Sequence, residues 1–120
     1  MNLEELPRAF SMKTVLLETK SITDWDSFHS EFARLMGFPD FYGHNMNAWI
    51  DCMSYLNDAN AGMSKIILEN GEALVINVAD TEGFKKRLPE IFEALVECTA
   101  FVNQRYAEDN ETSVVALAFQ

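Results

Sequence analysis

The stretch from Phe38 to Met53 reads FPDFYGHNMNAWIDCM and carries more structural information than any other part of the chain. Its first half contains a proline and, at Gly43, a glycine where the backbone must bend, which is typical of an exposed loop. Asn45 then indicates a helix cap, because its side-chain oxygen accepts a hydrogen bond from a free N–H of the first helical turn. The stretch therefore predicts a loop that leads directly into a helix.

The predicted helix after Asn45 has two different sides. Apolar residues recur at i, i+3, i+4 and i+7, which is the pattern of one buried helical face. They are Met46, Trp49, Ile50 and Met53, and the polar side opposite consists of Asn47, Asp51, Ser54 and Asp58. We expect the helix to run to about Leu56, with Trp49 and Met53 in the core and Asn47 and Asp51 accessible to solvent. An exposed loop followed by such a helix is suited to a rigid recognition surface.

Strands and helices alternate along the rest of the chain. Short apolar runs predict strands at 14–17, 73–78 and 114–119, the last of them in the middle of a sheet that is covered on both faces. Asn70-Gly71 indicates a hairpin in which 65–68 forms an additional antiparallel strand. A helix capped by Thr23 ends at Gly37, and two more helices begin near Asp80 and at Pro89. This alternation predicts a parallel sheet with right-handed crossovers.

The loop and helix also resemble the barstar family, the small intracellular inhibitors of secreted bacterial ribonucleases. The shared pattern is an aromatic pair, glycine, any residue and asparagine, followed by alanine, aspartate and cysteine in the helix. The matching residues are Phe41, Tyr42, Gly43, Asn45, Ala48, Asp51 and Cys52. The weak periodicity of residues 1–11 predicts an N-terminal arm, and the resemblance implies one α/β, barstar-like domain over residues 12–120. It implies a three-stranded parallel sheet packed with about four helices, and an extra antiparallel edge strand stays open.

The resemblance also implies which residues bind a partner: Phe41, Gly43, Asn45, Asn47, Ile50 and Asp51. Asp51 matches the family aspartate that enters the ribonuclease active site in place of a substrate phosphate. A carboxylate offers acceptors to the arginine, lysine and protonated histidine that such a site holds for phosphate. Phe41, Asn47 and Ile50 stand where tyrosine, aspartate and tryptophan are common in the family. These departures remove a hydroxyl, a charge and a large anchor, so the identity of the target stays open.

The chain is strongly acidic, with 19 Asp and Glu against 9 Lys and Arg and a net charge of -10. This balance argues against nucleic acid as a partner, because the neutralisation of phosphates drives that binding. It has two readings, a surface that keeps the protein soluble or a complement to a basic partner that it attracts electrostatically. Together with the motif, it favours a basic protein partner, a secreted ribonuclease, and we expect a monomer when the protein is free.

We expect neither catalysis nor a cofactor. His29 and His44 lack the spacing of metal ligands. His44 and Cys52, eight residues apart, would be separated by about 12 Å along a helix, too far for a nucleophile and its base. Cys52 and Cys98 are expected to be reduced thiols, although a disulfide between them stays open.

The sequence contains no membrane-spanning run of roughly 20 apolar residues, and its N-terminus lacks the basic residues of a secretory signal. We therefore expect a cytoplasmic protein without membrane association. The function that the resemblance implies is an immunity-type inhibitor, which blocks a ribonuclease active site with the acidic helix and the loop before it. The alternative is a barstar-fold interaction module whose partner is not a ribonuclease.

Overall fold

A parallel sheet of three strands forms one layer of the protein. The structure, a computed structural model, describes residues 11–111 and 114–120. The strands β1 (Met12–Leu17), β2 (Ala73–Val78) and β3 (Val114–Phe119) lie in the order β1-β2-β3. Both pairs are parallel, which confirms the predicted three-stranded sheet. The predicted N-terminal arm at 1–11 lies, apart from Ser11, outside the described residues.

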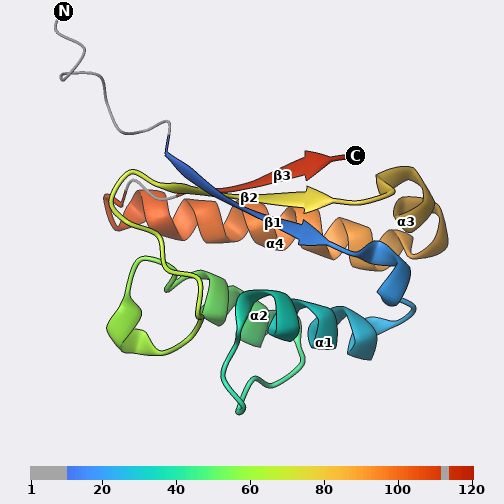
Figure 1. The fold of residues 1–120 in the computed structure, drawn as a ribbon, viewed down its shortest axis with the longest axis horizontal. Coiled ribbons are helices and arrows are strands. Elements are labelled where there is room, and N and C mark those ends of the chain that lie inside the picture. The colour runs from blue at the N-terminus through green and yellow to red at the C-terminus, as the bar shows by residue number, and fades with distance from the viewer. Residues whose placement is uncertain (1–10, 112–113) are drawn as a thin grey trace, which may run out of the picture.

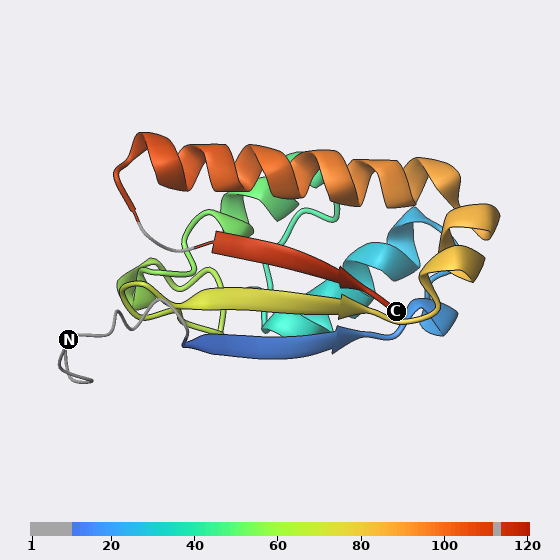
Figure 2. The same ribbon diagram turned by 90° about the horizontal axis from the view of Figure 1, so that it is seen from above.

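The described part of the chain has four helices, as expected: α1 (Trp25–Met36), α2 (Met46–Met53), α3 (Thr81–Arg87) and α4 (Pro89–Glu108). α1, α2 and α4 form a second layer on one side of the sheet, with α4 running along it, and α3 lies beyond the carboxyl ends of the strands (Figure 1; Figure 2). The core fills the space between the layers. The side chains of β2 alternate between buried and half-buried, and the buried ones belong to this core. Leu74, Ile76 and Val78 are the fully buried residues of β2.

The prediction for the C-terminal strand was wrong in one respect. β3 is an edge strand, and β2 is the central one. Val115 is buried beneath the helices, whereas Val114 and Ala116 on either side of it are exposed. The residues that point away from the helices in β3 are small and apolar, and such residues occur commonly on protein surfaces. The strand therefore shows none of the alternation between apolar and polar residues that would have revealed its open face.

The predicted hairpin is also wrong, because residues 65–68 form no strand. Both edges of β2 are already paired with β1 and β3, so no edge remains for an antiparallel neighbour. The backbone of the segment bonds elsewhere. The N–H of Lys65 donates to the carbonyl of Met36 at 2.9 Å, and that of Leu68 to the carbonyl of Leu56 at 2.7 Å. Asn70-Gly71 thus turns the chain into β2 from a loop.

Caps define the helix starts within one residue of the prediction. Asp24, not Thr23, begins α1: its Oδ1 accepts from the N–H of Ser27 at 2.8 Å, and Ser27 Oγ accepts from the N–H of Asp24 at 3.0 Å. This reciprocal pair is a capping box, which satisfies two free N–H groups at once. Pro89 occupies the first turn of α4, as predicted.

Candidate partner-binding surface

Asn45 caps α2, which confirms the predicted start of that helix. Its Oδ1 accepts from the N–H of Ala48 at 2.8 Å, and its Nδ2 donates to the carbonyl of Gly43 at 3.2 Å. A Cβ at position 43 would lie 3.2 Å from that same amide nitrogen, which is tighter than an ordinary contact. Glycine at this position therefore protects the cap, and the cap fixes the direction in which α2 leaves the loop.

The two sides of α2 are as the sequence predicted. Trp49 and Met53 are fully buried, and Asn47 and Asp51 are exposed. Ile50 is half-buried against the core. The other predicted contact residues, Phe41, Gly43 and Asn45, are exposed on the adjoining loop. The predicted set therefore lies along one short segment of chain that precedes and includes α2.

The helix ends earlier than predicted, at Met53 instead of near Leu56. Ser54 Oγ donates to the carbonyl of Ile50 at 2.6 Å, and the chain then turns. Asp58 is consequently not on the polar side of α2. It caps the short 3-10 turn at Ala59–Ala61, where its Oδ1 accepts from a backbone N–H at 3.0 Å.

The loop separates its two aromatic residues. Phe41 is 75% exposed, whereas Tyr42 is buried. The N–H of Tyr42 donates to the carbonyl of Pro39 at 2.9 Å, which closes a turn at the tip of the loop. One ring of the pair thus anchors the loop in the protein, and the other is left at the surface.

Two histidines connect this loop to α1. His29, which is 1% exposed, pairs through Nδ1 with the hydroxyl of Tyr42. His44 contacts Asp26 Oδ1 through its own Nδ1 at 3.2 Å. Burial raises the pKa of Tyr42 well above its ordinary value, so its hydroxyl keeps its proton and can donate to a neutral His29. The loop is therefore attached to α1 at a buried and at an exposed point.

We expect His29 to make stability depend on pH. Burial, and to a smaller extent the neighbouring His44, lowers the pKa of His29 to about 4, partly opposed by Asp26. In the unfolded chain the pKa returns to about 6.5, so the unfolded state gains the proton first as the pH falls. The contribution of His29 to the free energy of unfolding is therefore complete above about pH 7 and is lost toward pH 4. At pH 5 the free energy of unfolding is lower by about 2 kcal/mol.

Urea denaturation at pH 7.5 and pH 5 measures this effect in the wild type and in His29→Gln. The wild type should lose about 2 kcal/mol more unfolding free energy between the two pH values than the variant does. Carboxylates titrate in both proteins and cancel in that comparison. Equal losses would show that His29 takes up its proton equally well in the folded protein.

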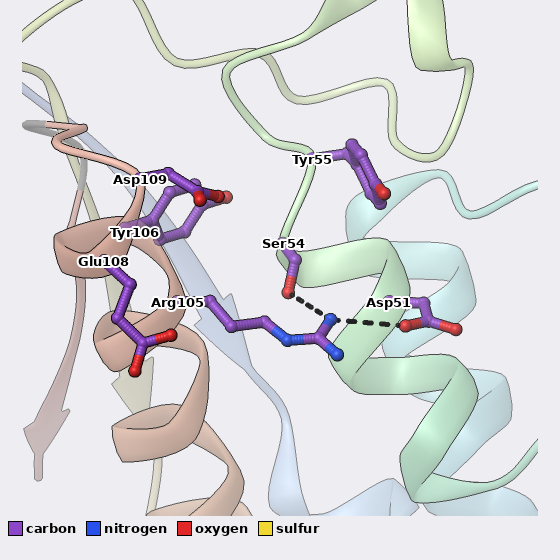
Figure 3. Close-up of a pocket in the computed structure, with 7 residues that line it drawn as sticks. All are labelled: Asp51, Ser54, Tyr55, Arg105, Tyr106, Glu108 and Asp109. Atoms are coloured by element: carbon purple, nitrogen blue, oxygen red, sulfur yellow. Dashed lines mark hydrogen bonds and ion pairs between the residues drawn. The ribbon is translucent and has the colours of Figure 1, made fainter.

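Asp51 lies in a hollow that the sequence did not predict (Figure 3). The hollow, of about 410 Å³, is formed between α2 and the C-terminal end of α4. Arg105 reaches across from α4, and its Nη1 lies 3.4 Å from Asp51 Oδ1 and 3.4 Å from Ser54 Oγ. The side chains of Asp51 and Arg105 are 57% and 42% exposed, so the pair is open to solvent.

Sequence reasoning missed what α4 and the residue after it contribute to this hollow: Arg105, Tyr106 and Glu108 of α4, and Asp109 at its C-terminal cap. The only available signal was that Arg105 is the sole lysine or arginine after Arg87. Its contact with Asp51 joins positions 54 residues apart. No local pattern encodes such a contact, because it depends on how α4 packs against α2.

Neither cysteine is activated. Both are free in the structure, so the disulfide that the sequence left open is not formed. Burial raises the pKa of Cys52 to about 11 and also raises the pKa of Cys98. A thiol with a raised pKa is largely protonated at neutral pH and is a poor nucleophile.

Residues 11–111 and 114–120 contain neither a cluster of metal ligands nor a helix that could span a membrane. No cluster of three or more His, Cys, Asp or Glu side chains is placed there to hold a metal ion. None of the helices in this part of the chain has the length and apolar character needed to cross a membrane.

A three-stranded parallel sheet packed with helices, with the capped helix α2 exposing Asp51 at the surface, is the architecture of barstar-like α/β domains. The family model described as Barstar (barnase inhibitor) matches residues 12–118, and the chain belongs to this family. The family is one of ribonuclease inhibitors and not of enzymes. No curated protein matches the chain.

Proposed function

We propose that this protein is an immunity-type inhibitor, which blocks the active site of a basic ribonuclease with α2 and the loop before it. The observation that carries the proposal is the position of Asp51, exposed on a capped helix beside an exposed loop, in a chain of the barstar family. In the complex, Asp51 would take the place of a substrate phosphate and accept hydrogen bonds from the cationic groups of the enzyme. Phe41, Gly43, Asn45, Asn47 and Ile50 would form the surrounding contact.

The charge of the chain supports a basic target. A net charge of -10 attracts a cationic enzyme over distances of about a Debye length and so raises the rate of association. We further propose that the protein acts in the cytoplasm as a monomer, where it would protect the cell from a ribonuclease made by itself or a neighbour.

A second candidate is an interaction module of the same fold whose partner is not a ribonuclease. Asn47 and Ile50 favour it, because they lack the charge and the large ring that are common at these positions in the family. Arg105 favours it too, because it places a positive charge 3.4 Å from the aspartate that would have to face a cationic pocket.

Barnase, the enzyme in the family's description, is the first probe. If the proposal is right for this enzyme, cleavage of a fluorogenic RNA should fall linearly with added protein and vanish near a one-to-one ratio. Bovine serum albumin at the same concentration controls for an acidic protein that merely sequesters the enzyme. If barnase and other basic bacterial ribonucleases keep full activity in a large excess of the protein, the second candidate is favoured.

A further inference from the structure

Arg105 is held in place on three sides. Its guanidinium lies 5.2 Å from the centre of the Phe101 ring, one turn earlier on α4. The same group contacts Asp51 and Ser54 on α2. Figure 3 shows the side chain extended from α4 toward both residues. Stacking on an aromatic ring and a fixed hydrogen-bonding direction are characteristic of a guanidinium that is preorganised.

The charges around Arg105 are otherwise negative. Asp51, Glu108 and Asp109 line the same hollow, and among the described residues that line it Arg105 is the only cation. No other lysine or arginine occurs after Arg87, and none occurs between Arg34 and Lys65. The guanidinium thus neutralises part of an acidic surface at the position where Asp51 is exposed.

We propose that Arg105 is an internal counterion of Asp51 and that it sets the specificity of this surface. The inference rests on the proposed function, because it concerns the cationic groups of a target protein that would bind Asp51. A cation that approaches Asp51 must displace the guanidinium or lie beside it. Weakly basic partners are disfavoured by this competition. A target with several fixed cations can overcome it, because an ion pair exposed to this degree is weak.

A hexa-arginine peptide tests the competition without a known target. We would follow the amide signals of residues 46–55 by NMR while titrating the labelled protein with the peptide at low salt. Arg105→Gln should bind the peptide about three- to tenfold more tightly than the wild type, the range expected when a weak exposed ion pair and a like charge are removed. Higher salt should reduce the difference.

Lys86→Gln is the matched control, because it removes one positive charge from α3, at the opposite end of α4 (Figure 1). It should change the dissociation constant less than twofold. In an Asp51→Asn background the gain from Arg105→Gln should largely disappear, which a general change in net charge or in folding would not produce. Arg105→Lys keeps the charge but loses the planar group that stacks on Phe101, so it should bind the peptide with an affinity between those of the wild type and Arg105→Gln, and this intermediate gain is the test if Arg105→Gln unfolds.

Equal effects of Arg105→Gln and Lys86→Gln would overturn the proposal, as would a gain that persists without the Asp51 carboxylate. The barnase assay is read separately. Uninhibited barnase together with the expected peptide results would refute ribonuclease inhibition for that enzyme and retain the role of Arg105. Inhibition of barnase together with no effect of Arg105→Gln on peptide binding would support ribonuclease inhibition and refute the role of Arg105.

Discussion

Asp51→Ala should raise the dissociation constant for a ribonuclease that the protein inhibits at least about thirtyfold, mostly through faster dissociation, if the proposed function is right. In the complex the Asp51 carboxylate would be the acceptor for cations that the enzyme normally offers to phosphate. Its removal leaves those cations buried without a partner, which typically costs about 2–5 kcal/mol, a range that already rests in part on measurements of barnase and barstar themselves. The substitution also removes the contact between Asp51 and Arg105 in the free protein. This lowers the net cost of binding only slightly, because that ion pair is exposed and weak.

Asp58→Asn is the control for this prediction. It removes one negative charge while asparagine can still cap the short turn at Ala59–Ala61. Because Asp58 lies beyond the end of α2, its charge should affect mainly the association rate. Titration calorimetry and stopped-flow kinetics separate the two effects. Equal losses from Asp51→Ala and Asp58→Asn would mean that the target binds a different surface.

The same surface leads to an expectation for Asn47. An aspartate is common at this position in the family, and the side chain is exposed on α2. Asn47→Asp adds a second carboxylate one turn before Asp51 and should tighten the binding of a cationic enzyme. A weaker complex would indicate that the enzyme presents an anionic group to this part of the helix.

Local signals explain how much of the fold could be predicted. Asn45 and Pro89 mark helix starts because capping and the fixed φ of proline act within one turn. The alternation of strands and helices restricts the topology to a parallel sheet. The errors arose where tertiary packing decides. Residues 65–68 have the composition of a strand, yet β2 has no free edge for them.

The candidate site divides in the same way. Asp51 could be proposed because the short motif around it resembles that of the barstar family, and the helical period correctly placed it on the exposed side of α2. Arg105 could not, because its approach to Asp51 depends on the packing of α4 beside α2. The buried pair of His29 and Tyr42 was missed for a related reason. A histidine in an apolar helical pattern does not show which loop will cover it.

Met53→Ala should lower the free energy of unfolding by about 2–5 kcal/mol, the usual cost of truncating a large core side chain. Met53 is fully buried. Its surroundings have little freedom to collapse, because the hydroxyl of Tyr106 donates to the Met53 carbonyl at 2.6 Å and accepts from the N–H of Leu56 at 3.0 Å. These bonds fix the end of α2 to α4. Urea denaturation measures the change.

Two substitutions show whether this cost comes from the core. Met53→Leu conserves volume and should cost less than about 1.5 kcal/mol. Asp51→Ala, two residues earlier, removes an exposed side chain and should change stability by no more than about 0.5 kcal/mol. A loss below about 1 kcal/mol for Met53→Ala would mean that α2 can shift to fill the space. In that case α2 would not hold Asp51 in a fixed position, which would count against the proposal that this surface is preorganised to bind a ribonuclease.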